Sequence, residues 1–282
     1  MESKFVLWLK SISRPIELFF KEILRKLFKK RMLEKIIRKG DFYNIPIYII
    51  SFNRLEYVKQ MVDWLTDFGY KKIIIIDNNS DYRPLLDYYK TIDCKVIYMK
   101  KNYGYLVFYK SMKFFFKRNF SFYILTDPDL SPVEGTKSNF VEVFCKIMLN
   151  HLELTKVGSS LKIDDLPDEY YLKQEVIDWE KKFYYNPFQE KYLEGINLYN
   201  AEIDTTLSLN SPFVFVAHVN KRFAIRVGEP YQMRHLPWYL VKETKENNHY
   251  CKTIRTDMTN WNGNFSREEI KDRNKKAIKE ED

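Results

Sequence analysis

The sequence is poor in the residues that break or cross-link a chain. Its 282 residues include only 8 glycines, 10 prolines and 3 cysteines. So few glycines and prolines exclude collagen-like and low-complexity disordered chains, while a hydrophobic fraction of 45% is enough for a sizeable core. Cys94, Cys145 and Cys251 are odd in number and far apart. They predict neither a disulfide framework nor a metal-binding cysteine pair, and they favour a reducing compartment.

Several common signals are missing as well. There is no Gly-Lys-Ser/Thr loop and no Gly-x-Gly-x-x-Gly fingerprint, which excludes Walker-type and dinucleotide-binding motifs. No run reaches the roughly 18–20 uncharged residues that a transmembrane helix requires, and frequent charges exclude a secretory signal. We therefore expect a cytoplasmic protein, with the inner face of the membrane as a candidate peripheral location.

The positive charge is concentrated at the N-terminus. Residues 1–40 contain 12 Lys/Arg and 4 Asp/Glu, which leaves 35 basic and 34 acidic residues for the rest of the chain. Because a nucleic-acid-binding domain carries its basic charge on the folded body, we expect no nucleic-acid partner. Ser13 and Pro15 predict a helix start, and Gly40 predicts its end. Between them, one helix face is apolar: Ile12, Ile16, Phe19, Phe20, Ile23, Leu24, Leu27 and Phe28.

Two interpretations of this basic amphipathic helix are open. Residues 12–39 can lie in the interface of an anionic membrane, with the lysines directed toward the headgroups. Alternatively, the helix can dock on the folded body or on a second subunit and leave its basic face in solvent. The sequence does not decide the oligomeric state.

The next hundred residues alternate between strand-like and helix-like patterns. Continuous apolar runs predict strands covered on both faces, which implies an α/β fold with a mostly parallel sheet and helices on each side. The predicted strands are 45–52, 73–76, 95–99 and 122–125, and the predicted helices between them are 55–68, 82–90 and 105–117.

Polar residues follow each of these four strands. Each one alone is typical of an ordinary turn. Ligands of parallel sheets, however, bind beyond the carboxyl ends of the strands, so polar residues on four successive ends predict a nucleotide site. The residues are Ser51, Asn53 and Arg54 after the first strand, Asp77, Asn78, Asn79 and Ser80 after the second, Lys100, Asn102 and Gly104 after the third, and Asp127 and Asp129 after the fourth.

Asp127 and Asp129 flank Pro128 directly after the fourth strand. Two carboxylates at this spacing can bind one cation, and Mg²⁺ and Mn²⁺ prefer oxygen ligands completed by substrate phosphates. Two solvated aspartates in a loop are the commoner origin of an Asp-x-Asp pattern. The position at the end of a buried strand favours a metal site here.

At these residues the chain resembles a known family, the GT-A glycosyltransferases, and most closely their bacterial family two type. The resemblance covers residues 44–135 well and extends more loosely to about 240. It implies that Asp77 contacts the base, that Asn79 and Asn102 hold the nucleotide, and that Asp127 and Asp129 form the Asp-x-Asp motif for Mn²⁺ or Mg²⁺. The segments that carry it are 46–54, 76–80, 102–104 and 127–129.

The same resemblance assigns roles in the second half. Asp204, with Glu202 as second candidate, precedes a predicted strand at 213–217 and would accept the proton of the acceptor hydroxyl; equally, Asp204 could cap a turn through Thr206. His235 would be the third metal ligand, although a lone histidine is often only structural. Arg226 or Arg234 would pair with the diphosphate.

The resemblance implies a metal-dependent transfer of a sugar from a nucleotide-sugar, most commonly a UDP-sugar, to a glycan, glycolipid or protein acceptor. The predicted organisation is a helical segment (1–40), a GT-A domain (41–265, with a nucleotide half 41–135 and an acceptor half 136–265) and a charged tail (266–282). One alternative, a sugar nucleotidyltransferase, requires a glycine-rich loop where Ser51–Arg54 has none. Another is an inactive transferase-like scaffold at a membrane, against which the intact carboxylates argue.

Overall fold

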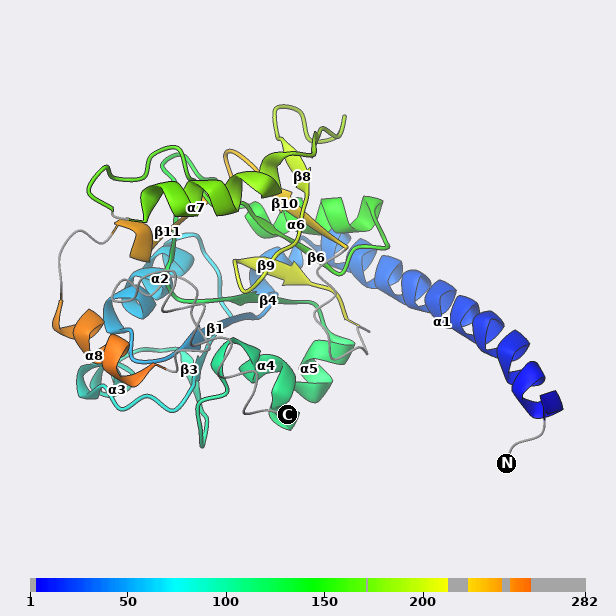
Figure 1. Ribbon diagram of the computed structural model, residues 1–282, viewed down its shortest axis with the longest axis horizontal. Coiled ribbons are helices and arrows are strands. Elements are labelled where there is room, and N and C mark those ends of the chain that lie inside the picture. The colour runs from blue at the N-terminus through cyan, green and yellow to red at the C-terminus, as the bar shows by residue number, and fades with distance from the viewer. Residues whose placement is uncertain (1–3, 171, 213–222, 240–243, 255–282) are drawn as a thin grey trace.

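The computed structural model describes residues 4–170, 172–212, 223–239 and 244–254. It is an α/β protein built on a nine-stranded sheet flanked by helices (Figure 1). The sheet has the strand order β3-β2-β1-β4-β9-β6-β10-β8-β7, and a separate two-stranded sheet pairs β11 with β5. The architecture is compatible with the Rossmann-like fold predicted from the sequence.

The strands are β1 (Ile47–Ser51), β2 (Ile73–Asp77), β3 (Lys95–Tyr98), β4 (Tyr123–Thr126), β5 (Leu130–Pro132), β6 (Lys156–Ser159), β7 (Pro187–Phe188), β8 (Leu198–Asn200), β9 (Ser208–Asn210), β10 (Ala224–Val227) and β11 (Met233–His235). The α-helices are α1 (Lys4–Lys39), α2 (Leu55–Asp67), α3 (Arg83–Tyr88), α4 (Val107–Lys110), α5 (Phe115–Phe120), α6 (Phe140–Asn150), α7 (Lys173–Glu180) and α8 (Lys245–Thr253). Short 3-10 helices are η1 (Asp41–Asn44), η2 (Gly104–Leu106), η3 (Met112–Phe114), η4 (Lys181–Tyr184) and η5 (Leu236–Tyr239).

The four predicted strands are confirmed and pair in parallel, with β1 between β2 and β4. Beyond β4 the sheet is mixed, because β9 runs antiparallel to both β4 and β6. The carboxyl ends of β1, β2 and β4 therefore meet at one edge of the sheet, where the sequence predicts the ligand site.

Both faces of β1 and β4 are buried and β2 is nearly so, as their continuous apolar sequence predicts, whereas β3, at the edge of the sheet, is partly exposed. Successive side chains alternate between the two faces. Ile47 and Ile49 pack in the larger core with Leu33 of α1 and the apolar sides of α2 and α6. Tyr48 and Ile50 pack on the opposite face in a smaller, aromatic core with the residues of α4 and η3.

The predicted helix at 105–117 is wrong. Four short helical pieces, η2, α4, η3 and α5, replace it. The break comes at Ser111, whose backbone is extended and whose hydroxyl accepts a hydrogen bond from the Lys113 amide at 3.3 Å. A serine side chain that satisfies a nearby amide competes with helix continuation.

The predicted start of the N-terminal helix is also wrong, whereas its end is confirmed. Helix α1 begins at Lys4 and runs without interruption through Ser13 and Pro15, although a proline inside a helix removes one backbone hydrogen bond. It ends at Gly40, whose φ of 63° is left-handed. The helix extends well beyond the body of the protein (Figure 1).

Within the described part of the chain, no helix combines the length and the apolar character that a bilayer-spanning helix needs. Cys94, Cys145 and Cys251, all within the described ranges, form no disulfide. The strand predicted at 213–217 and the charged tail predicted at 266–282 lie outside the described residues.

Candidate functional site

Ser51 and Asp77 lie side by side where β1 and β2 end, as partners in the parallel register. Both are buried, and Tyr89 of the following segment lies over them. The Tyr89 hydroxyl donates to Ser51 Oγ at 2.8 Å and lies 3.4 Å from Asp77 Oδ1. Burial raises the pKa of Asp77, against hydrogen bonds that favour its charged form. The carboxyl predicted to contact a base is thus held in a fixed, largely dry position.

Asn53 joins three segments that are distant in the sequence. Its side-chain oxygen accepts from the backbone amides of Asp81 (2.9 Å) and Tyr82 (3.0 Å). Its side-chain nitrogen donates to Asp81 Oδ1 (2.7 Å) and to Thr253 Oγ1 of α8 (2.9 Å). These four bonds satisfy the amide, so Asn53 fixes the loops after β1 and β2 against α8.

The loop after β3 is tied to the loop after β2 by a second amide network. The side-chain nitrogen of Asn78 donates to Asn102 Oδ1 at 2.8 Å and to the Gly104 carbonyl at 3.0 Å. Gly104 has a φ of 62°, a conformation that glycine adopts without steric cost. Asn79 and Lys100, the other nucleotide-binding candidates of these loops, are exposed. The two loops thus form one rigid rim beside Asp77.

Arg54, which follows β1, is a buried positively charged side chain at the carboxyl edge of the sheet. It is only 8% exposed, and its guanidinium lies 3.6 Å above the ring of Tyr250 and donates to Asn247 Oδ1 at 2.9 Å. No carboxylate in the described ranges lies within ion-pairing distance of it, yet it contributes to lowering the pKa of Asp129. A buried guanidinium held by an aromatic ring is poised to bind an anion.

Asp129 and His235 are brought together by the small sheet. Strand β5 pairs with β11 so that Leu130 faces His235, and the Leu236 amide donates to the Asp129 carbonyl at 2.8 Å. As a result, His235 Nε2 lies 3.5 Å from Asp129 Oδ2. Burial by itself would raise the pKa of Asp129, but His235 and Arg54 outweigh it and hold that pKa below its usual value.

Two polar atoms of this pair are buried without a hydrogen-bond partner among the described residues: Asp129 Oδ1 and His235 Nδ1. The imidazole also packs against Trp238, with ring centroids 4.6 Å apart. Buried polar atoms are normally satisfied, and an exception calls for an explanation such as a bound ion.

Asp127 points toward a different neighbour. Its backbone amide donates to the Thr205 carbonyl at 3.0 Å, and the Thr205 hydroxyl donates to its carboxylate. Burial, and then the charge of Asp129, raises the pKa of Asp127 well above its ordinary value. The positive charge of Lys156 opposes this increase in the pKa.

The described residues contain no group of three or more His, Cys, Asp or Glu side chains placed to hold a metal ion. The three predicted ligands Asp127, Asp129 and His235 therefore do not form such a group here, and the carboxylate of Asp127 is engaged by Thr205 instead. Asp129 and His235 are the two that stand together, so a cation at this edge would take most of its ligands from substrate or water.

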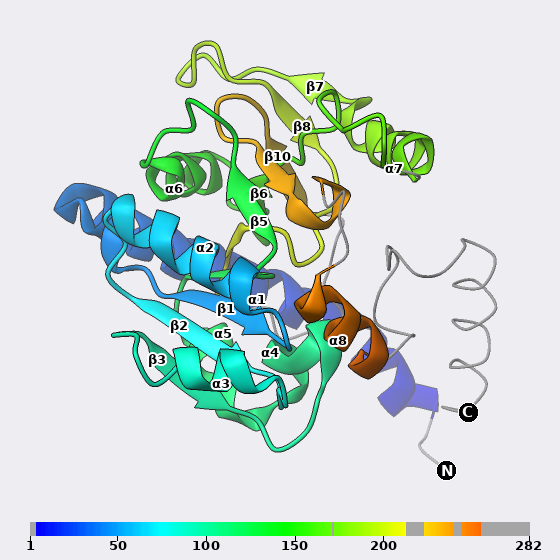
Figure 2. The same cartoon turned by 90° about the vertical axis from the view of Figure 1, so that its left-hand side faces the viewer.

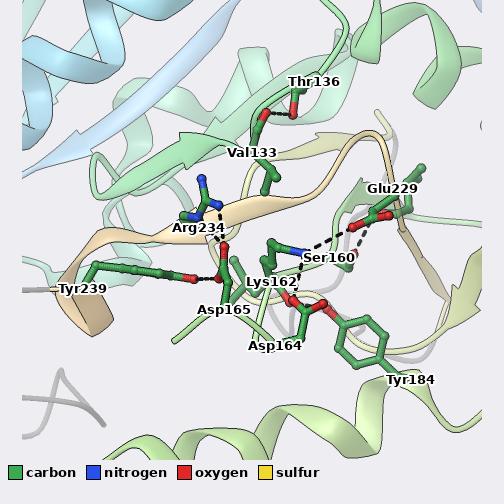
Figure 3. Close-up of polar contacts among 12 residues, drawn as sticks. Val133, Thr136, Ser160, Lys162, Asp164, Asp165, Tyr184, Glu229, Arg234 and Tyr239 are labelled. Carbon is green, nitrogen blue, oxygen red and sulfur yellow. Dashed lines mark hydrogen bonds and ion pairs between the residues drawn. The ribbon is translucent and has the colours of Figure 1, made fainter. Parts of the chain in front are cut away.

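The two arginines predicted near the diphosphate are already paired within the protein. Arg226 is buried and donates to Glu180 Oε2 at 2.8 Å and to the Glu202 carbonyl at 2.7 Å. Arg234 holds Asp165 from two nitrogens, and Tyr239 donates to the same carboxylate (Figure 3). Their charges are therefore compensated, in contrast to that of Arg54.

Asp204 and Glu202 are exposed on the loop before β9. Asp204 lies near enough to Asp127 to raise its pKa, so the candidate base and the acidic pair share one region. In the part of the chain that the structure describes, no hydrogen bond links Asp204 to Thr206, which leaves its carboxylate unengaged by the turn. The Lys156 ammonium donates to the Asp204 carbonyl at 3.0 Å and holds this loop.

Sequence reasoning missed several residues that shape the site. Thr205 and Lys156, which flank Asp127, carry no recognisable motif, and they meet Asp127 only through the pairing of β9 with β4 and β6. Helix α8, which holds Arg54, could have been predicted from its N-cap residue. The Thr244 hydroxyl caps the helix by accepting from the Asn247 amide at 3.0 Å.

Comparison with known protein families and curated proteins does not assign the chain to a family. No protein-family model matches the chain, and a search of curated proteins finds no match either.

Proposed function

We propose that this protein is a metal-dependent glycosyltransferase of the GT-A type, which moves a sugar from a nucleotide-sugar to a glycan, lipid-linked or protein acceptor. The observation that carries the proposal is the meeting of Asp129 and His235, 3.5 Å apart, at the carboxyl edge of the parallel strands. The buried Arg54 beside them supplies the charge that a diphosphate requires. UDP is the proposed carrier, on the resemblance alone.

Mn²⁺ or Mg²⁺ fits this pair of residues. Asp129 Oδ1 is buried without a partner among the described atoms, and an unsatisfied carboxylate oxygen is a suitable donor for a hard cation. Such cations are commonly held by one or two carboxylates together with substrate phosphates, so the absence of a three-residue group among the described residues is compatible with binding that depends on the nucleotide. When bound, the metal would neutralise charge on the departing diphosphate.

The remaining roles fall to the side chains of this chain. Arg54 pairs with phosphate oxygens, while Tyr250 and Asn247 keep its guanidinium from turning away. Asp77, fixed by Tyr89 and Ser51, accepts hydrogen bonds from the base or ribose. Asn53 keeps the loops that carry these groups in register.

Transfer replaces one carbon–oxygen bond by another. The bond from the anomeric carbon to the diphosphate breaks and leaves its electron pair on the nucleotide, and the acceptor oxygen forms the new bond. The hydroxyl proton of the acceptor passes to Asp204, or to Glu202 as the second candidate, both of which are exposed and able to meet an incoming acceptor.

The test is a thermal-shift panel of nucleotide-sugars with and without Mn²⁺, followed by donor hydrolysis. We expect UDP-sugars to raise the melting temperature by several degrees in the presence of Mn²⁺, since saturation at about 100 times Kd adds roughly 2.7 kcal/mol. The Asp127→Asn/Asp129→Asn double variant should lose this metal-dependent shift, and its hydrolysis rate should fall by about 100-fold or more.

Asp67→Asn is the matched control, because Asp67 is an exposed carboxylate at the end of α2. It should keep both the shift and the rate. Metal-dependent hydrolysis that survives in the double variant would contradict the metal assignment. A folded wild-type protein that no nucleotide-sugar stabilises would instead favour the inactive scaffold.

A further inference from the structure

An open groove of about 710 Å³ lies along β3 and extends over the amino-terminal parts of β1, β2 and β4. Its walls include Tyr48 and Tyr123 near the starts of β1 and β4, Ile74 near the start of β2, and Phe114 of η3. Strand β3 is the edge of the sheet (Figure 2), and all four of its residues line the groove. Its lining includes none of Arg54, Asp129 and His235, and it comes nearest to the candidate site at Tyr98, which pairs with Asp77 in the sheet.

The groove combines an apolar floor with a basic rim. Lys72, Lys95, Lys113 and Lys117 are exposed lysines of its lining, and no aspartate or glutamate is among its lining residues. Lys113 is held by donating to the Tyr98 carbonyl at 3.1 Å. Four ammonium groups around an aromatic floor suit the anionic head of an amphiphile.

The helical segment beside the groove, formed by η3 and α5, exposes a stripe of apolar side chains. Met112 and Phe116 are each 73% exposed, and Phe120 is 50% exposed. They follow one another at four-residue spacing, and the rings of Phe116 and Phe120 stack with centroids 6.1 Å apart. Lys113 and Lys117 lie next to this stripe on the same helical segment, and both line the groove.

We propose that this surface, made of the stripe Met112–Phe116–Phe120 and the four groove lysines, binds the headgroup region of an anionic phospholipid bilayer. Exposed aromatic and methionine side chains next to lysines are the combination that interfacial segments use: the apolar groups enter the acyl boundary and the ammonium groups meet phosphates. A soluble anion would use the lysines but would leave the apolar stripe in water. The surface is distinct from α1 and from the proposed active site.

The test is cosedimentation of the full chain with vesicles of phosphatidylcholine alone and with about a quarter phosphatidylglycerol, at low and high salt. We expect partition onto the anionic vesicles that weakens with salt. Phe116→Ser/Phe120→Ser and, separately, Lys113→Glu/Lys117→Glu should each lower the partition coefficient by about tenfold or more. Inorganic phosphate should compete only weakly.

The matched control is Lys59→Glu/Lys137→Glu, which makes the same change in net charge at exposed lysines away from the groove. It should lower partition by less than the groove pair does. Thermal unfolding of each variant shows that it is folded. The proposal is overturned if folded aromatic and groove-lysine variants partition within about twofold of the wild type, or if the two lysine pairs have equal effects. Loss of binding in the lysine variant alone would also overturn it, because charge without the apolar stripe would then account for the partition.

Discussion

Lys29 is a buried charge that holds α1 against the body. Its ammonium group donates to the carbonyls of Leu152 and Leu154, just beyond the end of α6. Burial, with repulsion from Arg25 as a smaller cause, lowers the pKa of Lys29 to about 7. An unfolded chain has a lysine pKa near 10.4, so the folded and unfolded states bind different numbers of protons at neutral and alkaline pH.

This difference predicts how stability depends on pH. Below about pH 7 the lysine is charged in both states, and the full cost of burying it is present. Above pH 7 the folded state loses the proton first, so the unfolded state binds more protons and the free energy of unfolding rises, by about 2 kcal/mol between pH 7 and pH 9. Lys29→Met should remove this rise in denaturant titrations, whereas Lys30→Met, at an exposed neighbour, should retain it. Equal slopes in all three proteins would exclude this role for Lys29.

At the scale of single elements, the close approach of β6 to β9 depends on Gly158. A Cβ added there would lie 2.5 Å from the Leu207 carbonyl oxygen and 2.7 Å from Ser208 Cβ. Since both neighbours belong to the sheet backbone or its immediate side chain, they cannot move aside independently. Gly158 therefore permits the close spacing of β6 and β9, and the loop before β9 carries Asp204 and Thr205.

Gly158→Ala should lower the free energy of unfolding by about 1–3 kcal/mol, the usual cost of overpacking. Chemical denaturation followed by circular dichroism measures it. Ser159→Ala is the control in the same strand: its buried hydroxyl has no partner among the described atoms, so its removal should be neutral or stabilising. If the two variants unfold at the same denaturant concentration, the overlap at Gly158 is relieved at no cost.

At the scale of the whole molecule, α1 belongs only partly to the body. Leu33 is fully buried in the main core, and Lys29 is buried with it. Leu24, Leu27 and Phe28, by contrast, are 51–54% exposed. The C-terminal part of α1 therefore completes the fold, while the part before it projects from it (Figure 1).

Two truncations separate these parts. Deleting residues 1–21 should change the free energy of unfolding by less than about 1 kcal/mol, whereas deleting residues 1–39 should cost at least the 2–5 kcal/mol of an emptied leucine site. Thermal unfolding distinguishes them. If α1 also lies on an anionic membrane, which is one of the two interpretations of its basic amphipathic sequence, the shorter deletion should reduce partition onto anionic vesicles while Phe116 and Lys113 still contribute. Unchanged partition after that deletion would remove the membrane role of the segment.

The helices and strands that the sequence predicted correctly are those whose hydrophobic pattern lies within one short stretch of chain. The isoleucine run at 73–76 predicted a covered strand, and β2 occupies it, with Ile74 only partly buried. The alternation of such runs with helical stretches predicted the parallel half of the sheet and its polar carboxyl edge. Where a single side chain decides, as at Ser111, the periodic pattern predicted a continuous helix that the structure interrupts.

The sequence by itself determined the strands of the first half, the edge at which their polar ends gather, and the amphipathic character of α1, because each follows from spacing along a short stretch of chain. Only the tertiary structure decided which of those polar groups stand together. The pairing of β5 with β11 sets His235 beside Asp129, and α8, 193 residues away along the chain, holds Arg54. The same packing neutralises Arg226 and Arg234 through Glu180 and Asp165. Contacts between distant segments depend on how the whole sheet closes, and no local period encodes them.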